Sequence, residues 1–351
     1  MFWIYFEYIY ISTMIVLLRN EDNTFEQPIV SSLSSMHFFN VLFCTSIDFN
    51  HDGLLDIVVL DNCLPSVRVY LGNGDGTFHE LIFLLSNCTT AISLSIGNLN
   101  NDEFLDFAVL CSFSSNSINV IFGNVDETFT PNTIVNDLLG TLVMLMSVKI
   151  ADLNGDNYED IVAVNQAEFG IDVFIGYGNG TFDKQKISLF GKGGSTILAS
   201  IGVGDFNEDM IQDVIFLYVS GTYQVGLAFG YNDGTFSPPI KLNLKIEFML
   251  SYPLIITDFN NDGLLDIVTT TYNPSTLNIY FGDGNGNFEL YTAFSSEALN
   301  YYTYIATVNF NDDNHPDIFI ASTLGVYIFL NTGQCDNNMS DIFETSTSIY
   351  N

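Results

Sequence analysis

The chain has 351 residues, 48 % of them hydrophobic, which is enough apolar material to bury a core in one or two domains. It carries 41 acidic and 8 basic residues, for a formal net charge of −33. This charge disfavours nucleic acid as a partner, and the high hydrophobic content excludes a disordered acidic tail. The acidity therefore belongs either to a solvated, halophile-like surface or to carboxylates gathered to hold cations.

The first eighteen residues are strongly apolar, with Glu7 as their only charge. A signal peptide or an anchor is one interpretation, but no basic residue precedes Arg19 and no Ala-x-Ala cleavage site follows. The alternative is a pair of buried strands, because residues 15–25 align with a later strand and turn at residues 69–78. We expect residues 1–47 to form a partial repeat unit with a lead-in strand, and we do not expect membrane association.

The stretch from Asp48 to Asp56 places side-chain oxygens at positions 1, 3, 5 and 9 of a nine-residue loop, and a β-branched strand follows it. Oxygens at alternate positions of a tight loop can converge on one point, which suits a hard cation such as Ca²⁺. An EF-hand is excluded because its twelfth position would be Val59 rather than Glu, and because a strand follows rather than a helix.

The same loop recurs six times, starting at residues 48, 98, 152, 205, 258 and 309, and the starts are 50 to 54 residues apart. A Gly/Asn/Asp-rich turn marks the other end of each unit, as in residues 72–78, with copies starting at Gly123, Gly176, Gly230 and Gly282. Short β-branched runs lie between these motifs, so each unit is predicted to have four strands. This period predicts an all-β chain forming a β-propeller of four-stranded blades, with seven blades favoured and six possible.

We expect a single propeller over residues 1–334. Residues 326–330 fit a third strand without a clear fourth, and the polar residues 335–351 are expected to form a loose tail.

In its acidic loops and its Gly-Asn-Gly-Asp-Gly-Thr-Phe turn (residues 72–78), the chain resembles the FG-GAP or VCBS-type repeat family, which includes the integrin α-subunit propellers. The resemblance covers roughly residues 15–330. It implies that each loop joins the first and second strands of a blade and binds Ca²⁺ on one side of the propeller. Because no leg-type domain or transmembrane helix is evident after the repeats in this sequence, we do not expect it to be a complete integrin subunit.

The resemblance also implies the calcium ligands, including the main-chain carbonyls of Leu54 and Leu264 at position 7. The side-chain ligands it implies are Asp48, Asn50, Asp52 and Asp56; Asn98, Asn100, Asp102 and Asp106; Asp152, Asn154, Asp156 and Asp160; Asp205, Asn207, Asp209 and Asp213; Asp258, Asn260, Asp262 and Asp266; Asn309, Asn311, Asp313 and Asp317.

The six sites are not expected to be equal. Position 6 requires a sharp turn with positive φ, which Gly53 and Gly263 supply best and Met210 supplies poorly. Asn98 and Asn309 replace the first carboxylate with a neutral amide. We therefore rank the loops starting at residues 48, 152 and 258 above the others, and those starting at residues 98 and 309 lowest.

A simpler interpretation is that these Asp and Asn residues only form Asx-type turns. The six loops nevertheless hold 20 of the 41 acidic residues, and carboxylates that recur at fixed offsets would repel one another without a cation. No catalytic Ser/His/Asp or Cys/His set stands out. The five cysteines do not fix the compartment, and three glycosylation sequons at Asn87, Asn179 and Asn338 are near the number expected by chance.

Together these observations predict a calcium-stabilised, non-catalytic binding or adhesion module, extracellular or at the cell surface, with a protein or glycan ligand on one propeller face. Alternatives are a carbohydrate-binding propeller, a calcium-dependent polysaccharide lyase or hydrolase on the same fold, and a truncated gene product. The lyase or hydrolase would need a cleft with a Lys, Arg or Tyr base, which 8 basic residues support only thinly.

Overall fold

The protein is built from antiparallel β-strands, as the alternating β-branched and aromatic runs predict. The structure, a computed structural model, contains no helix in the residues that it describes. These residues are 2–6, 13–18, 29–32, 41–61, 64–85, 88–111, 117–133, 145–165, 170–187, 197–244, 254–272, 275–295, 302–309, 313–322, 325–333 and 343–350. None of them belongs to a helix long and apolar enough to cross a membrane.

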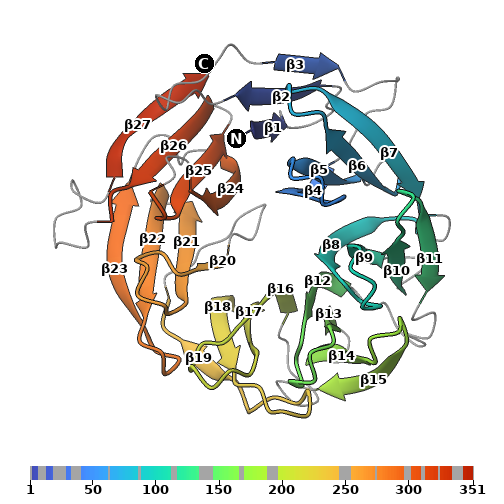
Figure 1. Cartoon of the computed structure of the whole chain (residues 1–351). Coiled ribbons are helices and arrows are strands. Elements are labelled where there is room, and N and C mark those ends of the chain that lie inside the picture. The colour runs from blue at the N-terminus through green and yellow to red at the C-terminus, as the bar shows by residue number, and fades with distance from the viewer. Residues whose placement is uncertain are drawn as a thin grey trace. The chain divides into compact units, whose positions relative to one another are not determined.

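The chain divides into two compact units, of which the first comprises residues 1–194 and 232–235. It contains a three-stranded sheet and three four-stranded sheets (Figure 1). Their strands are β1 (Phe2–Phe6), β2 (Thr13–Leu18) and β3 (Ile29–Ser32); β4 (Val41–Ile47), β5 (Asp56–Asp61), β6 (Ser66–Gly72) and β7 (Phe78–Leu84); β8 (Ala91–Gly97), β9 (Asp106–Cys111), β10 (Ser117–Gly123) and β11 (Phe129–Thr133); β12 (Leu145–Ala151), β13 (Asp160–Asn165), β14 (Gly170–Gly176) and β15 (Phe182–Ile187).

The second unit comprises residues 195–231 and 236–351 and contains three more four-stranded sheets. Their strands are β16 (Ile197–Gly204), β17 (Asp213–Ser220), β18 (Thr222–Ala228) and β19 (Ile240–Leu242); β20 (Leu254–Thr257), β21 (Asp266–Tyr272), β22 (Ser275–Gly282) and β23 (Phe288–Ser295); β24 (Tyr302–Val308), β25 (Asp317–Ser322), β26 (Gly325–Asn331) and β27 (Phe343–Tyr350).

Each four-stranded sheet is a meander whose hydrogen-bonded order follows the chain. In β5 and β6 every residue is buried, whereas the outer strand β7 is only partly buried. Middle strands that are buried on both faces must be covered on both sides, which is the situation of a propeller blade packed between its neighbours. The predicted all-β architecture of four-stranded blades is confirmed, with six complete blades and the three-stranded sheet β1–β3.

The blades of each unit are held together by hydrophobic clusters that join consecutive sheets. In the first unit, one cluster joins Val58 and Val69 to Phe107 and Ile121, and a second joins β8–β11 to β12–β15. In the second unit, corresponding clusters join β16–β19 to β20–β23 and then to β24–β27. Burial between successive blades is thus the principal apolar stabilisation of each unit.

The two ends of the chain test two of the sequence expectations. The apolar residues 1–18 contain the two predicted strands, β1 and β2, which pair in antiparallel register. The expectation of a loose tail over residues 335–351 differs from the structure, because β27 pairs with β26 as the fourth strand of its blade. The Ser/Thr-rich sequence of β27 lacks the strong apolar alternation that identified the other strands.

Candidate calcium-binding loops

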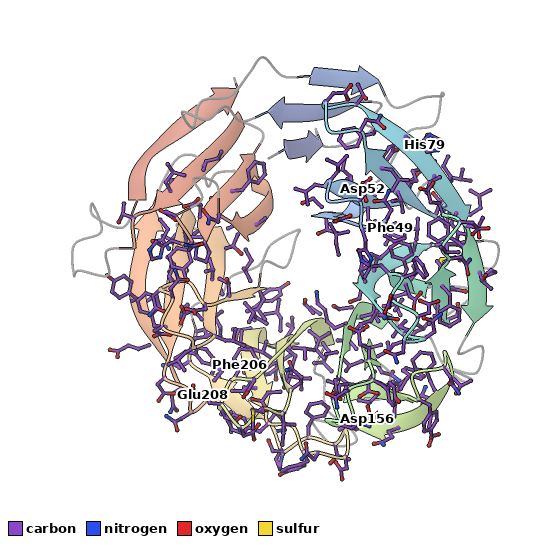
Figure 2. The ribbon with its side chains drawn as sticks, in the orientation of Figure 1. Phe49, Asp52, His79, Asp156, Phe206 and Glu208 are labelled. Atoms are coloured by element: carbon purple, nitrogen blue, oxygen red, sulfur yellow. A yellow bond between two sulfur atoms is a disulfide. The ribbon has the colours of Figure 1, made fainter. Side chains whose placement is uncertain are left out.

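Each acidic loop connects the first and second strands of a four-stranded blade, as the sequence predicts. In the first blade, Ile47 ends β4 and Asp56 begins β5, so the whole predicted loop lies between them. Figure 2 labels Phe49 and Asp52 on this loop. The ninth residue of every loop is also the first residue of the following strand.

The carboxylate at position 1 organises the loop by accepting main-chain hydrogen bonds. Asp48 accepts the N–H of Asp52 through Oδ1 at 3.1 Å and the N–H of Gly53 through Oδ2 at 3.0 Å. The loops starting at Asp152, Asp205 and Asp258 repeat both bonds. Four loops therefore use both oxygens of the first carboxylate to fold the chain around it.

Asparagine at position 1 changes this hydrogen-bond pattern. Asn98 accepts the N–H of Asp102 at 3.1 Å, and Asn309 accepts the N–H of Asp313 at 3.2 Å. An amide offers one acceptor oxygen where a carboxylate offers two, and its nitrogen cannot take the place of the second oxygen that accepts the main-chain N–H of position 6. These two loops thus have one fewer anchoring acceptor as well as one fewer negative charge.

Positions 3 and 5 are connected to each other in the same way from loop to loop. Asn50 accepts the N–H of Asp52 at 3.2 Å, and its Nδ2 donates to Oδ2 of Asp52 at 3.0 Å. The other oxygen of Asp52 accepts the N–H of Leu54 at 2.7 Å. The same side-chain pair occurs at Asn100 and Asp102, Asn154 and Asp156, Asn207 and Asp209, and Asn260 and Asp262. These bonds thus hold the amide of position 3 against the carboxylate of position 5 at one end of the sheet.

The backbone of the loops is left-handed at two positions. Position 6 has positive φ in all six loops, with values of 84° at Gly53, 73° at Glu103 and 66° at Met210, which confirms the predicted turn. Position 4 is also left-handed in the five loops where it is described, as at His51 with φ of 60°. The left-handed backbone at position 4 was not predicted, although four of these loops have Asn, Gly or His there, which tolerate this conformation, and the fifth has Glu208.

The aspartate at position 9 is buried and holds the loop to the rest of its blade. Asp56 accepts the N–H of Phe49 at 2.7 Å through Oδ2 and the N–H of Gly72 at 2.8 Å through Oδ1. Asp106, Asp160, Asp213 and Asp266 form the same two bonds. In the last blade Asn331 replaces the glycine and donates its N–H to Asp317. Because a carboxylate oxygen has two lone pairs, these bonds leave acceptor capacity for a cation.

Burial dominates the electrostatics of position 9. Desolvation raises the pKa of Asp106 to about 7 and the pKa of Asp160, Asp213 and Asp266 to about 6, and it also raises the pKa of Asp56. The two main-chain donors oppose this shift, while the nearby carboxylate at position 5 adds to it. A cation beside these carboxylates would favour their ionised form.

The position-7 residues and Asn311 complete the predicted ligand set. Leu54 and Leu264, expected to contribute carbonyls, lie half-buried within their loops. Asn311 lies outside the described residues. Among the residues that are described, no group of three or more His, Cys, Asp or Glu side chains lies close enough to share a metal ion. The predicted ligand sets also include the Asn side-chain oxygens at position 3.

Neighbouring blades contact one another through these loops. Phe49, labelled in Figure 2, stacks on Phe107 of the next blade with 5.4 Å between ring centroids, so the aromatic residue at position 2 of this loop serves packing between blades. Glu159, at position 8, accepts the N–H of Asn98 in the preceding loop. The Asn261 side chain donates to the carbonyl of Asn314 in the following loop at 2.7 Å. These roles of Glu159 and Asn261 could not be predicted from the sequence, because the hydrogen-bond partner of each residue lies in another repeat.

One further polar cluster lies within the β5–β7 strands. Arg68, only 4 % exposed, contacts Asp61 at 3.4 Å and Glu80 at 2.9 Å. The Tyr70 hydroxyl donates to Glu80 at 2.8 Å, and burial raises the pKa of Tyr70. A lyase base must reach substrate and lose its proton easily, and the buried Tyr70 meets neither requirement.

Comparison with known proteins agrees with this geometry. The sequence pattern of the FG-GAP-like repeat matches residues 48–109, 98–163, 152–216 and 258–320, which is more than half of the chain. This chain belongs to the FG-GAP-like repeat family. All six acidic loops lie within the matched segments, and four of them begin where a match begins.

Part of this FG-GAP-like chain is also similar in sequence to a human protein. The human T-cell immunomodulatory protein is 23 % identical over 195 residues, which are 54 % of this chain and 31 % of that protein. This chain therefore matches less than a third of that relative's length.

Solved structures show the same fold at low identity. A structure describing recognition of non-reducing terminal N-acetylglucosamine by an Agrocybe aegerita lectin has a TM-score of 0.67 at 16 % identity, covering 97 % of this chain and 88 % of the other. The BP39L lectin from Burkholderia pseudomallei has a TM-score of 0.62 at 12 % identity, covering 91 % of each chain. These similarities agree with the β-propeller fold of the FG-GAP-like chain.

Proposed function

We propose that this protein is a calcium-stabilised, non-catalytic binding module that works outside the cell. The observation that carries the calcium proposal is the repeated arrangement of the loop oxygens. In four loops the position-1 carboxylate is fixed by two main-chain donors, and the position-3 amide is fixed against the position-5 carboxylate. Oxygen donors held in this way at the end of a rigid sheet suit Ca²⁺, which prefers six to eight oxygen ligands.

Calcium binding would also offset repulsion within the fold. In five of the loops, acidic side chains lie near a buried aspartate whose ionised form is disfavoured by burial. A ligand that binds the folded chain but not the unfolded chain raises stability by mass action. The cations are therefore proposed to stabilise the blades, leaving recognition to other residues on the surface.

A thermal melting experiment tests this proposal. Protein stripped with a chelator should melt at a lower temperature than untreated protein, and added Ca²⁺ should restore the melting temperature in a saturable manner. Mg²⁺ should restore less of it, because Mg²⁺ demands near-ideal octahedral geometry. A melting temperature that is unchanged by chelator and by Ca²⁺ would show that the loops are turns only.

An extracellular location is supported by the disulfide between Cys88 and Cys111. It joins the segment before β8 to the end of β9, and Cys111 is fully buried within the blade. Disulfides persist in oxidising compartments and are rare in the cytosol. Non-reducing peptide mapping of protein recovered from its native source tests this part of the proposal, which fails if both cysteines are found as free thiols.

Glycan recognition is a second candidate, favoured by the lectins among the structures of similar fold. The loop end of the β12–β15 blade offers two exposed aromatic rings, Tyr158 at 39 % and Tyr177 at 55 % exposure. Exposed aromatic faces flanked by polar side chains provide apolar contact and hydrogen bonds together. A glycan array probed with wild-type protein and with Tyr177→Ala would test this idea, and loss of a specific signal in the variant is the expected result.

A further inference from the structure

The sequon Asn179-Gly180-Thr181 lies in the tight turn that connects β14 to β15. It is described in full, whereas Asn87 and Asn338 of the other two sequons lie outside the described residues. Asn179 and Thr181 are both exposed, and Gly180 takes a positive φ of 77°. The turn is closed by the N–H of Tyr177, which donates to the carbonyl of Thr181 at 3.1 Å.

Only the oxygen of the Asn179 side chain is used to build this turn. Oδ1 accepts the N–H of Thr181 at 3.0 Å and the hydroxyl of Thr181 at 2.6 Å. Within the described part of the chain, no hydrogen bond from Nδ2 of Asn179 is found. Two other turns do use an amide nitrogen, but from the place that Tyr177 takes here: Nδ2 of Asn73 donates to Thr77, and Nδ2 of Asn124 donates to Thr128.

The equivalent turns show that a nitrogen is not required at this position. Asp75, Asp126 and Asp233 occupy the place of Asn179, and each accepts the same two bonds from the threonine two residues later. An aspartate therefore satisfies the turn fully. The amide nitrogen of Asn179 is therefore not needed to form the turn. Its presence creates a sequon, because the turn already has a threonine two residues later.

We propose that Asn179 is an N-glycosylation site. The inference rests on the proposed extracellular location, because the modification needs passage through the secretory pathway. The co-reactant is an oligosaccharide attached to a lipid pyrophosphate. Nδ2 forms a bond to the anomeric carbon of the sugar, the bond from that carbon to the pyrophosphate oxygen breaks, and the lipid pyrophosphate leaves with the electron pair. Nδ2 loses one proton to solvent, while Oδ1 remains available to Thr181.

A glycan at this turn would stand next to the third acidic loop. A methyl group on Gly178 would lie 2.2 Å from the Tyr158 ring, so this ring of the loop packs directly over the turn. The sugar would therefore shield the loop end of the β12–β15 blade from large partners. A protease should consequently cleave this loop faster in an unglycosylated variant than in glycosylated wild-type protein.

The test uses the full chain directed into a eukaryotic secretory pathway by an added signal peptide, so entry into the pathway does not depend on the native location. Peptide mapping after treatment with a peptide N-glycosidase should show Asn179 converted to Asp. Asn179→Asp should abolish the modification and leave the melting temperature unchanged, because three sister turns already use Asp. Thr181→Ser should keep the modification.

Asp75→Asn provides a gain-of-function variant, since it creates a sequon in the equivalent turn of the first blade. It should acquire one additional glycan. An unmodified Asn179 in secreted, folded protein would overturn the proposal, whether or not Asn at position 75 is modified. That result would leave the calcium proposal intact, because chelator-dependent melting is measured independently on the same protein.

Discussion

Asp56 connects two segments of its blade that are far apart in the chain, because its Oδ1 accepts the N–H of Gly72 at 2.8 Å. Its other oxygen accepts the N–H of Phe49. Glycine allows this close approach, since a β-carbon at residue 72 would lie 2.4 Å from the carbonyl oxygen of Leu55. The ninth residue of the loop is thus a structural anchor in addition to being a predicted calcium ligand.

This dual role predicts how two aspartates of one loop should differ. Asp160→Ala leaves the N–H groups of Leu153 and Gly176 without their acceptor in a buried site, at roughly 1–3 kcal/mol each. Chemical denaturation should therefore show lower stability both in Ca²⁺ and in chelator. The control, Asp156→Ala, alters an exposed carboxylate and should reduce mainly the calcium-dependent part of the stability. Equal stability of Asp160→Ala and wild type in chelator would contradict the anchoring role.

The first position of the loop should set calcium affinity. Asp258→Asn removes one charge and the acceptor for the N–H of Gly263, giving this loop the pattern of the loop that starts at Asn98. We expect weaker calcium binding by calorimetry and a smaller rise in melting temperature. The reciprocal change, Asn98→Asp, should act in the opposite direction. If both substitutions shift calcium binding in the same direction, the ranking of the sites is wrong.

The raised pKa values of the buried aspartates predict an unusual pH dependence. The folded-state pKa is about 7 for Asp106 and about 6 for Asp160, both above the ordinary value of 3.8. The folded protein therefore binds protons more tightly than the unfolded chain, so this stabilisation is full below about pH 4 and is lost as the pH rises through 6 to 7. Chelator-treated protein should melt at a higher temperature at pH 5 than at pH 8.

Added Ca²⁺ should reverse the loss at pH 8 more than it changes the melting temperature at pH 5, because it binds the ionised carboxylates. Melting curves across this range, with and without Ca²⁺, make the comparison. A calcium effect that is larger at pH 5 than at pH 8 would rule out this explanation.

Met210 should be a removable source of backbone strain. It is 90 % exposed and takes a φ of 66° at position 6, where two other loops have glycine. The left-handed conformation costs a residue with a β-carbon roughly 1–2 kcal/mol. Met210→Gly should therefore raise stability by up to about 1 kcal/mol, after allowance for the greater entropy of glycine in the unfolded chain. Met210→Ala serves as the control and should give no gain.

Much of this arrangement could be predicted because it repeats along the chain. The six loop starts, the strand after each loop and the positive φ at position 6 all follow from residues within one repeat. The smaller number of acceptor atoms at the start of the loop at Asn98 also follows from its own sequence. The calcium ligands themselves remain a prediction.

Contacts between repeats were not predictable in the same way. The bond from Asn98 to Glu159 joins residues 61 positions apart, and no local pattern marks either residue as the partner of the other. The fourth strand β27 was missed for a related reason, because its place is set by pairing with β26 rather than by its own apolar pattern. The second hydrogen bond of Asp56, to Gly72, likewise became evident only from the folded blade.

The most direct test of calcium binding is a crystal structure of protein grown in Ca²⁺, with an anomalous difference map to locate the ions. We predict ions between the oxygens of the loops starting at Asp48, Asp152 and Asp258, with weaker peaks or none in the loops starting at Asn98 and Asn309. A map without a peak in any of the six loops would contradict the calcium proposal.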